Sequence, residues 1–202
     1  MKKFIAIAGN MGAGKTSMVT FLQQSYGFEP IYEPFMDNPY LDDFYKDMGT
    51  WAFHSQLYFI THKFRLHREL NGSSGTVVMD RTIYEDAEIF ARNLARGRYM
   101  SKRDWATYQE LYRTMLEALQ PPDLLIYLRC TPRAIRRRIK FRGRASEQAI
   151  PYRYIRRLND LYEDWIARYD LSPVLVWDSD NDDYVQDFRA LASFRRAIKP
   201  FV

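Results

Sequence analysis

Residues 9–16 read Gly9-Asn10-Met11-Gly12-Ala13-Gly14-Lys15-Thr16 and fit the pattern G-x-x-x-x-G-K-T at every position. The apolar run 4–8 before them predicts a buried strand, and residues 15–26 after them predict a helix. Glycines let the backbone N–H groups turn toward phosphate oxygens, and the helix N-terminus adds partial positive charge. We therefore expect residues 9–16, called the phosphate loop, and the adjacent Ser17 to bind nucleoside triphosphate. Lys15 would reach the outer phosphates and Thr16 would bind Mg²⁺.

Short apolar runs alternate with longer amphipathic stretches along the rest of the chain. Besides 4–8, the apolar runs predict strands over 30–33, 76–80, 124–128 and 174–177. The amphipathic stretches predict helices over 15–26, 51–70, 83–96, 102–119, 132–141, 151–168 and 184–197. Runs without in–out alternation suit strands that are covered on both faces. The sequence therefore predicts an α/β fold in one domain, residues 1–202, with a five-stranded parallel sheet flanked by helices.

Composition and charge narrow the class of protein. The chain has 30 Lys and Arg against 25 Asp and Glu, a formal net charge of +5 that attracts anions such as nucleotides or nucleic acid. Cys130 is the one cysteine, so no intrachain disulfide can form, and we expect a buried thiol and a cytoplasmic protein. The run 4–8 is too short for a signal peptide, and no segment predicts a membrane span. We expect no membrane partner.

A carboxylate follows the second predicted strand, where Glu33 precedes Pro34. Residues at the carboxyl ends of parallel strands line the ligand crevice of an open sheet, so Glu33 would lie beside the phosphate loop. A carboxylate there could accept the proton of an attacking hydroxyl. It would repel an acceptor that already carries a phosphate, so it favours a nucleoside over a nucleoside monophosphate. The alternative is a solvated surface glutamate.

The predicted strand 76–80 ends in the opposite charges of Asp80 and Arg81, followed by Thr82. Asp80 could hold Mg²⁺, directly or through water. Arg81 could orient Glu33 and the acceptor oxygen and offset charge on the transferring phosphoryl group. A local salt bridge at a strand end is the alternative.

Taken in order, these features resemble the deoxynucleoside kinase family, and the resemblance covers most of the chain. It also rests on Tyr45, on Trp51-Ala52-Phe53-His54-Ser55-Gln56, on Tyr84 and Asp86, and on Arg138 and Arg142-Gly143-Arg144 with Glu147-Gln148. Bacterial members that act on deoxyadenosine or deoxyguanosine look most similar. The resemblance implies a P-loop kinase fold with an Arg-rich lid at about 138–148, and a homodimer. The implied reaction moves the γ-phosphate of ATP to the 5′-hydroxyl of a deoxyribonucleoside, in nucleotide salvage.

The resemblance also implies roles for matching residues in the nucleoside site. Glu33 is the general base there, and Arg81 supports it. Tyr45 and Glu147 hold the sugar 3′-hydroxyl, Gln56 and Asp86 read the base, and Phe90 stacks on it.

On the ATP side, the resemblance makes Arg138, Arg142 and Arg144 a lid over the phosphates. Asp183 and Tyr184 follow the last strand and would contact adenine. Arg138 and Arg142 are four residues apart and share one face if the helix continues that far. Guanidinium forks on phosphate oxygens would then exclude water as the lid closes.

Two departures from the family pattern leave the base preference open. Ser55 stands where many relatives carry an aromatic residue, and Lys63 stands where an arginine often partners the Asp86 carboxylate. ATP is the expected donor, and the sequence does not fix whether GTP can replace it. Rival interpretations are a monophosphate kinase similar to thymidylate kinase, a slow P-loop switch, and a nucleic-acid-binding module built on 129–144. We rank the last lowest and expect no nucleic acid partner, because those basic residues surround a predicted phosphate site.

Overall fold

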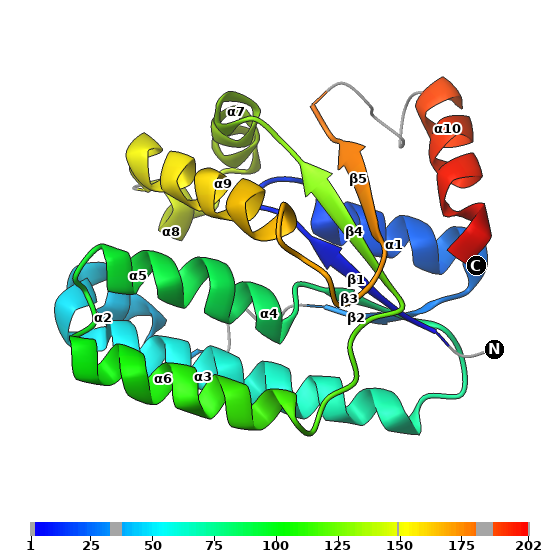
Figure 1. The fold of residues 1–202 in the computed structure, drawn as a ribbon. Coiled ribbons are helices and arrows are strands. Elements are labelled where there is room, and N and C mark those ends of the chain that lie inside the picture. The colour runs from blue at the N-terminus through cyan, green and yellow to red at the C-terminus, as the bar shows by residue number, and fades with distance from the viewer. Residues whose placement is uncertain (1–2, 33–37, 149, 181–187, 202) are drawn as a thin grey trace.

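The protein is described by a computed structural model that covers residues 3–32, 38–148, 150–180 and 188–201. It contains a five-stranded sheet in the order β2-β3-β1-β4-β5, and every neighbouring pair is parallel (Figure 1). The strands are β1 (Phe4–Ala8), β2 (Glu29–Ile31), β3 (Val77–Asp80), β4 (Leu124–Arg129) and β5 (Val174–Asp178). The predicted α/β class and strand number are confirmed.

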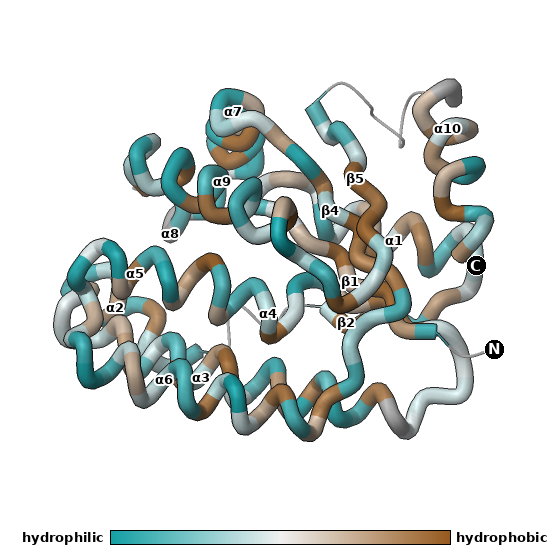
Figure 2. The backbone as a smooth tube through the Cα atoms, in the orientation of Figure 1, coloured by the Kyte–Doolittle hydropathy of each residue, from teal (hydrophilic) through white to brown (hydrophobic). Residues whose placement is uncertain are grey.

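The central strand β1 determines where the phosphate loop begins. All five of its residues are buried and apolar, as expected for a strand covered on both faces, and Figure 2 shows hydrophobic colour along it. Its register with β3 puts Ile7 opposite Asp80. The residues that follow β1 and β3 therefore emerge side by side at one edge of the sheet.

Helices cover both faces of the sheet. The longer helices are α1 (Lys15–Tyr26), α3 (Met48–Glu69), α6 (Lys102–Leu116), α7 (Pro132–Arg142), α9 (Tyr152–Ile166) and α10 (Phe188–Ile198). Shorter elements are α2 (Leu41–Lys46), η2 (Leu70–Gly72), α4 (Ile83–Glu85), η3 (Asp86–Ala91), α5 (Arg92–Arg96), α8 (Ala145–Gln148) and η4 (Lys199–Phe201). No helix within these described ranges is long and apolar enough to cross a membrane.

Alternate residues of β1 face two different core clusters. Phe4, Ala6 and Ala8 pack in the cluster that includes residues of α3, α6 and α9. Ile5 and Ile7 pack in the cluster that includes residues of α1, α7 and α10. Figure 1 shows the same division, with α3, α5 and α6 on one side of the sheet and α1 and α10 on the other. The sheet is thus the middle layer between two helical layers.

Three of the differences from the sequence prediction have identifiable reasons. Helix α3 starts at Met48, not at 51, because the Asp47 carboxylate caps it by accepting from the backbone N–H groups of Gly49 and Thr50 at 3.1 and 3.2 Å. Segment 83–96 is helical throughout, but residues 86–91 wind as a π-helix. Helix α2 is new, and six residues are too few to produce a periodic pattern.

Candidate active site

The phosphate loop takes a backbone path that its glycines make possible. Gly9, Gly12 and Gly14 have φ values of 150°, 74° and 100°. A Cβ on Gly9 would lie 3.0 Å from the Leu128 carbonyl oxygen, a tight contact that the β4 backbone would have to move to relieve, at a φ that other residues rarely adopt. The loop therefore curls against β4 before it enters α1, as the motif predicts.

Two side chains of the phosphate loop face inward and tie it to its surroundings. Asn10 is buried and its Nδ2 donates to the Ile155 carbonyl at 3.2 Å and to Asn159 Oδ1 at 3.3 Å, both on α9. Lys15 Nζ is also buried and donates to the Asn10 carbonyl at 3.2 Å. The Asn10 side chain thus anchors the loop to α9, while the expectation that the loop binds phosphate concerns its backbone N–H groups.

Thr16 and Asp80 meet where the two strands end. Thr16 Oγ1 donates to Asp80 Oδ2 at 2.8 Å. Asp80 Oδ1 is buried and accepts no hydrogen bond from any residue that the structure describes. Mg²⁺ in phosphate-transfer sites takes one or two protein oxygens together with phosphate oxygens. The two side chains predicted for the metal therefore lie together and offer the right type of ligand.

Arg81 has a strained backbone and a buried side chain. Its φ of 62° is unfavourable for a residue with a Cβ, at a cost of roughly 1–2 kcal/mol, so surrounding contacts must hold it. Its guanidinium carbon lies 4.4 Å from the centre of the Phe90 ring, and its Nε lies 3.9 Å from Glu85 Oε1. Phe90, predicted to stack on the base, thus also packs against the arginine.

Lys63 supports the same turn from α3. Its Nζ is fully buried and donates to the Arg81 carbonyl at 2.9 Å and to the Asp80 carbonyl at 3.4 Å. The sequence suggested Lys63 only as a weaker substitute for an arginine facing Asp86. These two hydrogen bonds hold the backbone of the turn in place.

Glu85 is a buried carboxylate that the sequence analysis missed. It accepts hydrogen bonds from the backbone N–H of Gly9 at 3.2 Å, from that of Thr82 at 3.1 Å and from the Tyr162 hydroxyl at 2.8 Å. Burial raises the pKa of Glu85, while the nearby charges of Arg81 and Lys15 act in the opposite direction. The spacing Thr82-x-x-Glu85, a capping box, was the signal that could have drawn attention to it.

The residues predicted to read the base come from packed neighbouring elements. Gln56 of α3 and Asp86 of η3 are 5% and 3% exposed, and these two elements pack together. Gln56 Oε1 is buried and accepts no hydrogen bond from the described residues, so it is available to a ligand donor. Ser55 is held by Asn38, whose Nδ2 donates to Ser55 Oγ at 3.0 Å. Tyr45 of α2 is half-buried, with its ring 5.3 Å from that of Phe44.

The three predicted lid arginines lie in two groups. Arg138 donates through Nη1 to Ser179 Oγ at 3.2 Å and to the Ala13 carbonyl at 3.4 Å, and through Nη2 to the Ser179 carbonyl. Arg142 donates through Nε to Glu147 Oε2 at 3.1 Å, and Arg144 Nη1 lies 3.7 Å from Glu147 Oε1. Helix α7 does continue to Arg142. Glu147, predicted for the sugar, therefore pairs with two lid arginines.

Several other predictions have separate outcomes. Glu33, Asp183 and Tyr184 lie outside the described residues. Cys130 is buried as expected, and burial raises the pKa of its thiol to about 12. His67 is also buried and hydrogen-bonds through Nε2 with the Gln120 carbonyl at 2.8 Å, a structural role.

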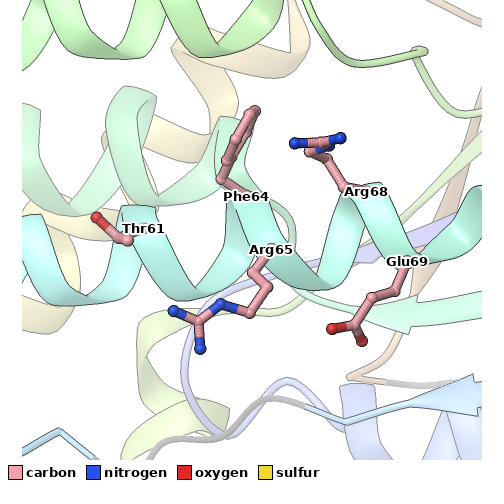
Figure 3. A pocket seen from close by; sticks show the side chains of 5 residues that line it. All are labelled: Thr61, Phe64, Arg65, Arg68 and Glu69. Carbon is pink, nitrogen blue, oxygen red and sulfur yellow. The ribbon is translucent and has the colours of Figure 1, made fainter.

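A pocket elsewhere on the molecule has a different character. It is lined by Thr61, Phe64, Arg65, Arg68 and Glu69, all on α3 (Figure 3). Four of these residues are exposed, and none was predicted for the site. Ligand sites gather polar groups from several elements, so this pocket is a weaker candidate than the edge of the sheet.

Comparison with known proteins agrees with this geometry. The family model described as deoxynucleoside kinase matches residues 5–202. The chain is 36% identical over 185 residues to the deoxyadenosine/deoxycytidine kinase of Bacillus subtilis, covering 91% of this chain and 85% of that protein. It is 38% identical over 192 residues to the deoxyguanosine kinase of Lactobacillus acidophilus, covering 90% and 82%. The structure of deoxyadenosine kinase from M. mycoides with the products dCMP and a flexible dCDP has a TM-score of 0.87 at 29% identity, covering 98% and 99%. The chain belongs to the deoxynucleoside kinase family.

Proposed function

We propose that this deoxynucleoside kinase transfers the γ-phosphate of ATP to the 5′-hydroxyl of a purine deoxyribonucleoside, in nucleotide salvage. The observation that carries the phosphate half of the proposal is the meeting of Lys15, Thr16, Asp80 and Arg81 at the ends of two adjacent strands. We expect the two buried cations of this arrangement, Lys15 and Arg81, to act on the transferring phosphoryl group. Positioning and charge stabilisation supply most of the acceleration in such reactions.

Each residue has a specific part in the proposed transfer. The phosphate loop binds the ATP phosphates, and Lys15 bears on the outer ones. Glu33 accepts the proton of the 5′-hydroxyl as that oxygen attacks the γ-phosphorus. Arg81 orients Glu33 and offsets the charge that develops on the phosphoryl oxygens. The lid arginines exclude water from the phosphates, and Asp183 and Tyr184 contact adenine.

Mg²⁺ is proposed to enter with ATP and to be held by Thr16 and Asp80, whose oxygens lie 2.8 Å apart. When bound, it would neutralise phosphate charge during transfer. Asp80 Oδ1 supports this assignment. It is a buried carboxylate oxygen that accepts no hydrogen bond from the described residues, and such an oxygen suits a cation.

The acceptor side is proposed from the relatives and from polar groups of α3 and η3. Relatives that match most of this chain are named deoxyguanosine kinase or deoxyadenosine kinase, and one is named deoxyadenosine/deoxycytidine kinase. Gln56 offers both a donor and an acceptor to a base edge, and Asp86 lies on the element packed against it. Tyr45 and Glu147 would hold the 3′-hydroxyl, and Phe90 would stack on the base.

Transfer of labelled phosphate to a panel of nucleosides and their monophosphates tests the substrate. We expect deoxyadenosine or deoxyguanosine to give the highest kcat/KM and deoxynucleoside monophosphates to give none. A pyrimidine deoxynucleoside with the highest kcat/KM would overturn the purine preference.

The variant Glu33→Gln tests the general base. It should cut kcat severely with little loss of ATP binding. Near-normal turnover would remove Glu33 from this role.

We also propose a cytoplasmic homodimer. Helices α3 and α6 pack together, and they carry apolar residues that are only partly buried in one chain, including Phe59, Phe64, Trp105, Leu111 and Tyr112. A second copy could cover them. Sedimentation equilibrium should give twice the 24.1 kDa chain mass, and a monomer at micromolar concentration would contradict the proposal.

A further inference from the structure

Glu85 occupies a position from which it contacts three parts of the site at once. It is fully buried, on the short helix α4 directly after the Asp80-Arg81 turn. Its two carboxylate oxygens accept from the first residue of the phosphate loop, from the backbone at Thr82 and from Tyr162 on α9. No residue that touches substrate in the proposed reaction makes this set of contacts, so the role of Glu85 is separate from theirs.

The contacts of Glu85 restrain the two groups that the proposed reaction needs in fixed places. The hydrogen bond from the Gly9 N–H fixes the point where the chain leaves β1 and begins to curl. The 3.9 Å approach of Arg81 Nε to Glu85 Oε1 draws the guanidinium inward, and the Thr82 N–H bond secures the backbone just after the strained Arg81. A displacement of about 1 Å in a group of this kind can cost on the order of 100-fold in rate.

Tyr162 links this carboxylate to α9. Its hydroxyl donates to Glu85 Oε1, and its ring stacks on that of Tyr127 with centroids 5.8 Å apart. Helix α9 also carries Ile155 and Asn159, the partners of Asn10 in the phosphate loop. The phosphate loop and the Arg81 turn are therefore both fastened to the same helix, one through Asn10 and the other through Glu85.

We infer that Glu85 is a positioning residue for phosphoryl transfer, which holds Arg81 and the start of the phosphate loop in register through Gly9, Thr82 and Tyr162. It does not touch substrate and acts through Arg81, so the inference rests on the role proposed for Arg81. A carboxylate suits this position because its three hydrogen-bond partners are all donors. The positive charges of Arg81 and Lys15 lie nearby as well.

The test uses Tyr162→Phe, Glu85→Gln and a matched control, Tyr127→Phe. Tyr127 is the stacked partner of Tyr162 and equally buried, but its hydroxyl donates to Glu163 at 3.0 Å, away from Glu85. We expect kcat to fall about 10- to 100-fold in Glu85→Gln and about 5-fold in Tyr162→Phe, and to stay within about 2-fold in Tyr127→Phe. The KM for the deoxynucleoside should change less than about 3-fold in all three, since none of these side chains binds it.

A double-mutant cycle separates positioning from general loosening of the fold. In an Arg81→Ala background, Tyr162→Phe should cause less than about a 2-fold further loss of kcat, because its effect passes through Arg81. Equal losses in Tyr162→Phe and Tyr127→Phe, or the full loss of Tyr162→Phe recurring in the Arg81→Ala background, would overturn the inference. If Arg81→Ala alone keeps normal kcat, the proposed role of Arg81 fails and the inference about Glu85 falls with it. If Arg81→Ala loses activity while Glu85→Gln keeps it, only the inference fails.

Discussion

The cations of the site are held in two contrasting ways. Lys15 and Arg81 are each 7% exposed and sit in what we call the site floor, formed by the phosphate loop, the Asp80-Arg81 turn and Glu85. In the lid, residues 138–148, the side chains of Arg142 and Arg144 are 36% and 54% exposed. Charges in a low-dielectric floor act strongly and without reorganisation, whereas exposed charges are screened by water. In the proposed reaction the floor would therefore serve the chemical step, and the lid would be free to rearrange.

Of the substitutions that compare floor and lid, removal of Lys15, one of the two floor cations, should lower activity the most. We expect Lys15→Met to lower kcat by about 10²- to 10³-fold, because a buried charge aimed at the phosphates has no replacement. Lys140→Met is the matched control, since Lys140 is exposed on α7, and it should stay within about 2-fold. Steady-state assays of both variants measure the difference. Similar losses in the two would erase the contrast between floor and lid.

A lid arginine should matter less than a floor cation. Arg142→Ala is expected to lower kcat/KM for ATP by about 10-fold, because water would partly screen its proposed contact with phosphate. Arg137→Ala, an exposed neighbour on the same helix, should change it by less than 2-fold, roughly the range of ordinary surface substitutions. Initial rates at varied ATP give the comparison. A loss as large as that of Lys15→Met would show that the lid acts like the floor.

Glu147 joins the lid to the sugar site in the proposed function. Glu147→Gln should raise the KM for a deoxynucleoside about 10-fold, since a charge-assisted hydrogen bond to the 3′-hydroxyl weakens. The same substitution should leave the KM for a 2′,3′-dideoxynucleoside nearly unchanged, because that analogue lacks the hydroxyl. Equal changes for both substrates would instead assign Glu147 to holding Arg142 and Arg144 alone.

Two glycines that end helices allow the backbone of the lid to be compared with that of α1. Gly27 ends α1 with φ 69° and Gly143 ends α7 with φ 71°, and an added Cβ would have no atom within 4 Å at either position. Gly27→Ala should lower the free energy of unfolding by about 1 kcal/mol through left-handed strain. Gly143→Ala should lower it less, because the exposed lid can relax. Urea unfolding of both variants is the measurement, and an equal loss would show that the lid is as rigid as the end of α1.

The smallest expected effect is the chemical labelling of the Cys130 thiol, which lies next to the lid residue Arg138. Arg138 Nη1 lies 3.4 Å from its Sγ. Burial raises the pKa of the thiol to about 12, so it stays protonated and unreactive at pH 8 and gains thiolate only as pH rises toward that value. Iodoacetamide labelling followed by mass spectrometry should be far slower than for glutathione. Labelling at the glutathione rate would mean that the lid base opens freely.

The predictions that succeeded concern local, contiguous patterns. Strand 4–8 and helix 15–26 match β1 and α1 at both ends, because the motif between them fixes where one stops and the other starts. The pairing of Thr16 with Asp80 also followed, since parallel strands place their carboxyl ends together.

The features that the sequence did not reveal depend on contacts between distant segments. Lys63 reaches carbonyl oxygens 17 and 18 residues away, and Tyr162 reaches Glu85 across 77 residues. Contacts between residues so far apart in the sequence produce no periodic pattern from which they could be predicted. The positive φ of Arg81 likewise follows from its surroundings, because arginine has no intrinsic preference for that conformation.

The π-helical turn over 86–91 has a consequence for how the proposed nucleoside site can change. Such a turn behaves as a single extra residue absorbed inside an otherwise ordinary helix. Deleting one residue there would restore ordinary α-helical winding inside the segment, while the helix before and after it kept its orientation. Asp86 and Phe90 lie within this turn, and Phe90 packs against Arg81, so one codon lost or gained would move the proposed base-reading residues and disturb the packing of Arg81 together.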